Sequence, residues 1–277
     1  MSLPFKQCRL APVILAGSLV ASAAAQVSIL PGQSPGSGGS QPWAISESGR
    51  VVGQITTPDP SGSTRAAAVW DNLLLSILPA LTLAPAGGLQ GTVAFGVNSS
   101  GTAVGMSAWP VSGPGGQFAS HAVRWSGGIA TDLGAIPGFK ISAARSINNS
   151  GEISGSGSNV FAGEAQVAVR WSPAGQMSQL NRLATHTTSS AWGINASGRI
   201  VGYSGIEDGD FTAERQPVIW DGQSVSALTL PAGFNQGAAR SINDASVIVG
   251  SSAAFDTTDY IFTDFRATIW NSGSPSL

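Results

Sequence analysis

The chain has 277 residues with 13 Lys plus Arg and 15 Asp plus Glu, which gives a formal net charge of −2 at pH 7. No stretch concentrates the basic residues, so nucleic acid is excluded as a partner, because phosphate binding requires a basic surface. Glycine contributes 36 residues and charged residues only 10% of the chain, a composition that suits short strands and tight turns better than long helices.

The first 25 residues have the pattern of a secretory signal peptide. Lys6 and Arg9 supply positive charge, residues 10–20 form an apolar stretch, and residues 23–25 are alanines that suit cleavage. The apolar stretch is too short and too rich in small residues to span a hydrocarbon core of about 30 Å. We therefore expect residues 1–25 to be removed and the product to be secreted, outside the cell or into the periplasm, without a membrane anchor.

We expect the mature chain, residues 26–277, to form a single domain. It keeps 13 − 2 = 11 Lys plus Arg and all 15 Asp plus Glu, so its formal net charge is 11 − 15 = −4. The only cysteine, Cys8, is lost with the signal peptide. Disulfides, thiol catalysis and cysteine-bound metals are therefore excluded from the mature protein.

Two short markers recur five times in the mature chain. The first is a turn between apolar segments, as in residues 146–155, and its copies end at Gly53, Gly105, Gly155, Gly202 and Gly250. The second ends in tryptophan, at Trp70, Trp125, Trp171, Trp220 and Trp270. Successive glycines are 52, 50, 47 and 48 residues apart, and successive tryptophans 55, 46, 49 and 50. A shared period of about fifty residues indicates a propeller or a solenoid.

One period contains four expected strands, which we name a to d. In the third copy they are residues 143–148, 152–156, 166–171 and 177–180, separated by segments rich in Asn, Ser, Pro and Gly. Four short antiparallel strands in about fifty residues form one propeller blade.

The chain ends soon after the fifth tryptophan marker, so the last blade is expected to lack strand d. Residues 27–30, just after the cleavage site, resemble the strand d endings at residues 132–138 and 227–233. A strand from the N-terminus would complete the last blade and remove the sheet edges that an open array has to cap. We therefore predict an all-β, five-bladed β-propeller of four-stranded antiparallel blades, with the ring closed by the N-terminal strand.

Small and large residues alternate along strand a, as in residues 94–97, 144–147, 191–194 and 239–242. A period of two places the small side chains on one face, where they would let the neighbouring blade approach closely near the axis. The tryptophan of strand c would fill the wider gap further out. We favour this role over a sugar-stacking platform, because a binding residue need not recur in every blade.

The phased markers resemble the HAF repeat, an extracellular bacterial repeat family named for a His-Ala-Phe tripeptide before the tryptophan. Residues 121–125, with the sequence His-Ala-Val-Arg-Trp, come closest to that tripeptide; the other four copies lack the histidine and none has the phenylalanine. The resemblance covers residues 43–270. It implies secretion and a repeat fold, and because the family carries no established activity, it implies no catalytic residue.

The b–c and d–a connections are long and irregular, whereas the a–b and c–d turns are short and uniform. In a propeller these two sets leave opposite ends of the ring, so a binding site is expected on the end with the variable loops. Aromatic rings on that end suit a glycan or protein ligand, unless they fold back over the blade tops. The candidate ligand-binding residues are Trp109, Phe118, Phe161, Phe211 and Tyr260, with Phe255 and Phe262 on the same face.

The densest acidic group lies in one of these loops. Glu207, Asp208, Asp210 and Glu214 are candidate calcium ligands, because hard cations bind several oxygens from a short segment. The EF-hand pattern fails after Asp210, however, so a solvated acidic loop is the alternative.

Signals for catalysis are weak. The Gly-x-Ser-x-Gly string at residues 32–36 lies in a loop instead of a strand-to-helix turn. His121 and His186 lie in different blades, so they do not form a metal-binding pair. Loop carboxylates could pair for glycoside hydrolysis, but no spacing selects a pair. We predict a secreted, non-catalytic binding or structural module without a cofactor; an extracellular carbohydrate-active hydrolase that uses loop carboxylates is the alternative.

Overall fold

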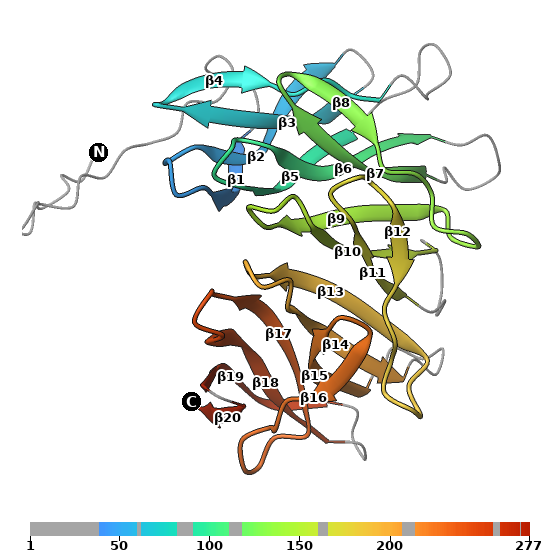
Figure 1. The fold of residues 1–277 in the computed structure, drawn as a ribbon, viewed down its shortest axis with the longest axis vertical. Helices are drawn as coiled ribbons and strands as arrows, with labels where there is room; N and C mark the ends of the chain where they lie inside the picture. Colours follow the sequence, from blue (N-terminus) through green and yellow to red (C-terminus); the bar gives the residue numbers. More distant parts are fainter. Residues whose placement is uncertain are drawn as a thin grey trace, which may run out of the picture.

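The computed structural model describes residues 39–59, 62–81, 91–110, 118–159, 166–206, 214–256, 261–271 and 273–277. In these residues the regular structure consists of twenty β-strands without a helix (Figure 1). The described part of the chain accordingly contains no helix that could cross a membrane.

The strands fall into five successive units of four. Unit one comprises β1 (Ser40–Ile45), β2 (Val51–Asp59), β3 (Gly62–Asp71) and β4 (Leu74–Ile77). Unit two comprises β5 (Gly91–Val97), β6 (Ala103–Pro110), β7 (Phe118–Ser126) and β8 (Ile129–Asp132). Unit three comprises β9 (Ile141–Ile147), β10 (Ile153–Ser158), β11 (Val167–Trp171) and β12 (Met177–Gln179). Unit four comprises β13 (Thr188–Ile194), β14 (Ile200–Ile206), β15 (Glu214–Asp221) and β16 (Ser224–Ala227). Unit five comprises β17 (Gln236–Ile242), β18 (Ile248–Asp256), β19 (Ile261–Asn271) and β20 (Ser274–Ser276).

Within each unit every strand pairs antiparallel with the next one along the chain. Units one, four and five each form a separate four-stranded sheet. Units two and three are joined into one sheet by a single parallel bridge between Ser120 of β7 and Ile141 of β9. The predicted all-β class and the predicted four-stranded antiparallel repeat are therefore confirmed.

The fourth strand of unit five is β20, which follows β19 directly and pairs Ser274 with Asn271 and Ser276 with Ile269. The prediction that the last repeat lacks a fourth strand of its own is therefore wrong. The physical reason is a tight hairpin: Gly273 adopts a φ of 82°, which a residue without a side chain does at little cost. Residues 27–30 lie outside the described residues.

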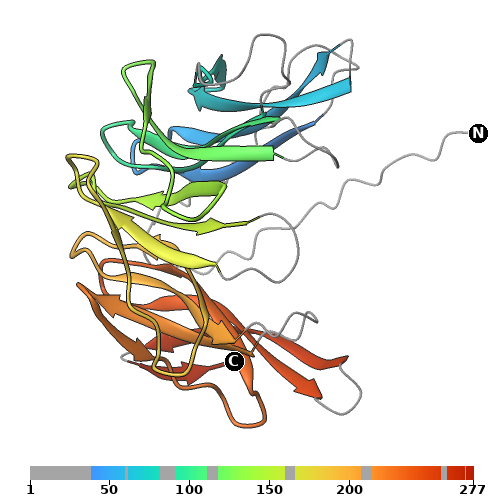
Figure 2. The same cartoon turned by 90° about the vertical axis from the view of Figure 1, so that its right-hand side faces the viewer.

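The five units follow one another around an arc, with the first strand of each unit on the inside and the fourth strand on the outside (Figure 1). Consecutive first strands contact each other from β1 to β17. In the view turned by 90° the units are stacked one above the next (Figure 2). Every two successive units pack closely strand against strand, whereas among the described strands units one and five show no such packing, so these strands do not close the arc into a ring.

Small residues on the first strands allow neighbouring units to approach closely. A Cβ at Gly96 of β5 would lie 3.0 Å from the Cα of Ser146 in β9, and one at Gly193 of β13 would lie 3.0 Å from the Cα of Ser241 in β17. Contacts this short are tighter than almost all real Cβ contacts, so a side chain at either glycine would have to push the neighbouring backbone aside by a few tenths of an ångström. The expectation drawn from the alternation of small and large residues is confirmed at these positions.

The five tryptophans of the second marker are at most 1% exposed. Further out from the first strands, Trp125, Trp171, Trp220 and Trp270 pack between successive units, whereas Trp70 packs against residues of unit one. The indole N–H of Trp220 donates to the carbonyl of Asn181 at 2.7 Å, and that of Trp270 donates to the carbonyl of Thr229 at 2.7 Å. Each bond ties a unit to the segment after the fourth strand of the preceding unit, and Trp125 and Trp171 make the same connection. Buried rings of this size dominate core energetics. The expected packing role between units is confirmed for Trp125, Trp171, Trp220 and Trp270.

The turns between the first and second strands are linked by asparagines. The side-chain amide of Asn98 donates to the carbonyl of Asn148 at 3.2 Å, that of Asn148 to the carbonyl of Asn195 at 3.0 Å, and that of Asn195 to the carbonyl of Asn243 at 3.2 Å. The side-chain oxygen of each accepts a backbone N–H four residues further on, which closes its own turn. The marker asparagine therefore forms its turn, as predicted, and also connects that turn to the next unit.

Candidate functional site

Each first strand carries a β-bulge at the same place. In all five units one residue of the first strand has no partner in the ladder with the second strand. A bulge of this kind bends the strand and turns the extra side chain in a new direction. The five bulged residues are Trp43, Phe95, Arg145, Trp192 and Arg240.

The last glycine of the first marker lies opposite each bulge. A Cβ at Gly105 would overlap the carbonyl oxygen of Val93, and one at Gly202 would overlap the carbonyl oxygen of Ser190; the other three marker glycines face the same conflict. A bulged strand brings its carbonyl too close to its partner for any side chain to fit. The marker glycine is therefore explained by the bulge, a role that the sequence alone did not predict.

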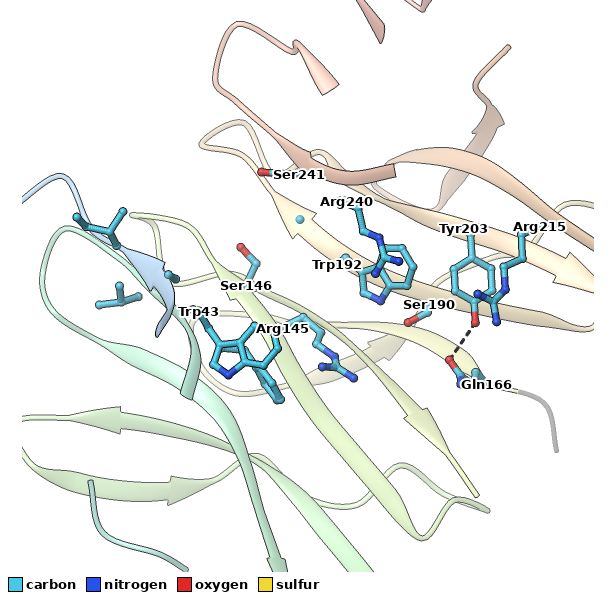
Figure 3. A pocket seen from close by; sticks show the side chains of 16 residues that line it. Trp43, Arg145, Ser146, Gln166, Ser190, Trp192, Tyr203, Arg215, Arg240 and Ser241 are labelled. Carbon is cyan, nitrogen blue, oxygen red and sulfur yellow. Dashed lines mark hydrogen bonds between the residues drawn. The ribbon is translucent and has the colours of Figure 1, made fainter. Parts of the chain in front are cut away.

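The bulged residues line a cavity of about 650 Å³ to which all five first strands contribute (Figure 3). This volume lies within the range of roughly 300–1,000 Å³ that is common for small-molecule sites. Three further residues complete the lining: Tyr203 in β14, Gln166 just before β11, and Arg215 near the start of β15. Because Gln166 and Arg215 follow the connections between second and third strands, the cavity reaches the end of the molecule from which these variable loops leave.

Cation–π contacts hold the arginines of the cavity in place. The guanidinium carbon of Arg240 lies 3.8 Å from the ring centroid of Trp192, and that of Arg145 lies 4.5 Å from the ring of Phe95. Arg215 lies 4.8 Å from the ring of Tyr203. Such contacts fix the flat face of a guanidinium and leave the N–H groups at its edge available to a ligand.

The aromatic rings also contact one another. Trp43 meets Phe95 at 5.7 Å between centroids with an interplanar angle of 69°, and Trp192 meets Tyr203 at 5.3 Å. The hydroxyl of Tyr203 donates to the side-chain oxygen of Gln166 at 3.0 Å (Figure 3). The lining is therefore a continuous set of packed rings and guanidiniums contributed by all five units.

The cavity is electropositive. Its described lining contains three arginines and no aspartate or glutamate. Burial lowers the pKa of Arg145, and the positive charge of Arg240 lowers it further, with Tyr203 acting in the opposite direction. Burial likewise lowers the pKa of Arg240, followed by the charge of Arg215. Arginine stays protonated in proteins at neutral pH, so Arg145 and Arg240 keep their charge although the pKa of each is lowered.

Four arginines elsewhere in the fold, Arg50, Arg170, Arg199 and Arg266, have carboxylate partners. Arg50 pairs with Asp71 at 2.6 Å, and Arg170 pairs with Glu152. In the cavity, by contrast, the Nε of Arg145 is buried and has no hydrogen-bond partner among the described residues. A buried donor without a partner is costly, so the cavity is suited to an anion that supplies the missing acceptor.

A second, smaller cavity of about 290 Å³ lies at the opposite end of the first strands. It is lined by the turns of all five units, including Asn98, Asn148 and Asn195. Ile45 and Val97 line both cavities, so the two spaces follow one another along the same strands.

The candidate binding residues from the sequence are only partly described. Phe161, Phe211 and Tyr260 lie outside the described residues. Trp109 and Phe118 lie at the ends of β6 and β7, where the backbone of Trp109 is paired with Ala119. The structure therefore leaves their predicted role as a prediction.

The calcium candidates Glu207, Asp208 and Asp210 also lie outside the described residues, while Glu214 is exposed at the start of β15. The described residues contain no group of three His, Cys, Asp or Glu side chains that could hold a metal. The calcium site likewise stays a prediction.

Other residues singled out in the sequence lie elsewhere. Phe255 and Phe262 contact each other at 5.0 Å on the hairpin of β18 and β19. His121 lies 2.8 Å from Asp132, and His186 lies 3.0 Å from the hydroxyl of Ser204. None of these residues lines the electropositive cavity.

The alternation in the sequence predicts only that the large residues of strand a share one face of that strand, and it does not predict that they form a cavity. A signal was nevertheless present, because each lies three residues before the Asn or Ser that begins a marker turn, as Arg145 lies before Asn148 and Trp192 before Asn195. In comparisons with known proteins, the sequence matches no protein-family model and no curated protein. The function is therefore inferred from the geometry of the cavity.

Proposed function

We propose that this protein is a secreted, non-catalytic binding module of the HAF-repeat type, and that its ligand is an anion bound in the electropositive cavity. One observation carries the proposal: Arg145, Arg215 and Arg240 share a cavity, rest on aromatic rings, and have no carboxylate among the described lining residues. Guanidiniums held in this way bind carboxylates, sulfates or phosphates strongly, because their N–H donors are charged and positioned in advance.

We further propose that the five units are the blades of a β-propeller whose axis passes through the two cavities. Each cavity is lined by all five units, which is the arrangement expected around a central axis. The asparagine chain from Asn98 to Asn243 links the turns of four consecutive units. The ligand would enter from the end that carries the variable loops, where sequence analysis placed the binding site.

The test is isothermal titration calorimetry on the mature protein with a hexuronate and with the neutral hexose of the same size. We expect the hexuronate to bind and the hexose not to, and binding to weaken as salt is added, because screening reduces the attraction between charges. Arg215→Gln should weaken binding, whereas Arg199→Gln should not, because Arg199 lies outside the cavity and pairs with Asp221.

Two results would contradict the proposal. Equal binding of the charged and neutral sugars, unaffected by Arg215→Gln, would show that the cavity arginines do not recognise the ligand. Turnover of chromogenic glycosides by the mature protein would instead support a hydrolase.

A further inference from the structure

The bulged residues that line the cavity follow an alternating pattern from unit two to unit five. Units two and four place an aromatic ring before a glycine, at residues 95–96 and 192–193. Units three and five place an arginine before a serine, at residues 145–146 and 240–241. All eight of these residues line the cavity. The lining therefore contains the same pair of residues twice, two units apart.

The cation–π contacts of these arginines repeat in the same way. Arg145 lies over Phe95 in the preceding unit, and Arg240 lies over Trp192 in the preceding unit. Each such pair, together with the serine that follows the arginine, forms what we call a half-site. The first half-site is Phe95, Arg145 and Ser146, and the second is Trp192, Arg240 and Ser241.

Each half-site is suited to one carboxylate. The face of the guanidinium is against a ring, so its edge is the part that remains for a ligand, and that edge matches the two oxygens of a carboxylate. The serine that follows each arginine also lines the cavity, but Figure 3 shows the hydroxyl of Ser146 directed away from the Arg145 guanidinium, so the guanidinium edge is the main carboxylate contact. Two like-charged half-sites in one cavity repel each other, so a ligand that neutralises both is favoured over one that neutralises a single arginine.

We propose that the cavity binds a ligand with two carboxylates, one on each half-site, and that this ligand is an acidic oligosaccharide. The inference rests on the proposed anion-binding function and specifies the class of ligand.

The remaining lining favours a saccharide over a small dicarboxylic acid. Trp43 is 49% exposed and meets Phe95 at a steep angle, so it offers ring surface on which the apolar side of a sugar can lie. Gln166 and Ser190 add polar groups that can hydrogen-bond sugar hydroxyls. The cavity of about 650 Å³ is also larger than a small diacid needs.

The experiment compares four probes by calorimetry on the full mature chain: a disaccharide of two uronic acids, the corresponding single uronic acid, succinate, and a nucleoside diphosphate. We expect the acidic disaccharide to bind at least ten-fold more tightly than any of the others. The variants are Arg145→Gln, Arg240→Gln and the conservative Arg240→Lys, with Arg199→Gln as the matched control outside the cavity.

The two half-sites predict different losses for different ligands. Removing one arginine should weaken the disaccharide at least ten-fold, because one of its carboxylates loses its partner. It should weaken the single uronic acid only about two-fold, because the other half-site still binds it. The affinity of Arg240→Lys should lie between those of the natural protein and Arg240→Gln. Lysine keeps the positive charge but lacks the two parallel N–H donors with which a guanidinium binds both oxygens of a carboxylate. Thermal melting of each variant separates a loss of binding from a loss of folding.

The outcomes separate a failure of the two-carboxylate inference from a failure of the proposed anion binding. If no anion binds, the proposed function fails as well. If the single uronic acid binds as tightly as the disaccharide, or both lose affinity equally on removal of one arginine, the two half-sites are refuted while anion binding stands. If succinate or the nucleoside diphosphate binds as tightly as the disaccharide, the assignment to an acidic saccharide is overturned.

Discussion

The glycine opposite each bulge offers a sharp test of how the sequence builds the cavity. Gly202 of β14 faces the bulge at Trp192, and a Cβ placed on it would overlap the carbonyl oxygen of Ser190 and lie 3.0 Å from its carbonyl carbon. Both obstructing atoms are backbone, so no flexible side chain can move aside. We predict that Gly202→Ala forces β13 and β14 apart or removes the bulge.

The size of the effect follows from two opposing contributions. Overpacking a tight site usually costs about 1–3 kcal/mol, and backbone obstruction places this site at the upper end. Replacing glycine by alanine gains at most about 1 kcal/mol from the less flexible unfolded chain. The net loss should be about 2 kcal/mol, or about 4–8 °C in Tm for a chain of this size.

Gly91 provides the matched control. It also lies in a β-strand, at the start of β5, but a Cβ at this position would meet nothing within 4 Å. Gly91→Ala should therefore leave Tm unchanged or slightly raised. Urea unfolding and thermal melting of both variants measure the difference, and Gly202→Ala should also weaken anion binding because Trp192 supports Arg240. A Gly202→Ala protein as stable as Gly91→Ala would refute the explanation of the marker glycine.

Two further predictions concern the packing around the cavity. Trp220→Ala should cost about 3–5 kcal/mol in the free energy of unfolding, because Trp220 is fully buried between units. Trp43→Ala should cost much less and mainly weaken ligand binding, because Trp43 is exposed in the cavity. Equal losses of stability in the two variants would contradict this difference in their roles. Asn195→Ala should cost about 1–3 kcal/mol, because it leaves the carbonyl of Asn243 and the N–H of Arg199 without their partner. Asn181→Ala, which removes one exposed side-chain hydrogen bond to the carbonyl of Gln223, should cost less stability in the same urea titration. A larger loss for Asn181→Ala than for Asn195→Ala would count against a stabilising role of the linked asparagines.

Features that depend on residues close together in the sequence were predictable from it. Asn148 and Gly151 form the expected turn, in which the Asn148 oxygen accepts the N–H of Glu152 and Gly151 takes a φ of 85°. The strands that flank this turn, β9 and β10, lie close to the expected residues. Their positions follow from turn chemistry and alternation, which act over a few residues.

The fourth strand of unit five shows where this reasoning was incomplete. The short segment after Trp270 contains Gly273 and so has a turn signal, but only three residues follow in β20, too few to display an alternating pattern. Pairing with β19 makes this segment a strand, and that pairing is a property of the sheet.

The sequence by itself determined the repeat, the β class and the four-stranded pattern of a unit, apart from the fourth strand of unit five, because these depend on patterns that recur about every fifty residues. Only the tertiary structure decided that Phe95, Arg145, Trp192 and Arg240 share one cavity, because these residues are brought together by bulges and by packing between units. The marker glycine depends on both the sequence pattern and the tertiary structure. Its recurrence is visible in the sequence, whereas its reason, a carbonyl of the bulged strand where a side chain would lie, exists only in the folded sheet.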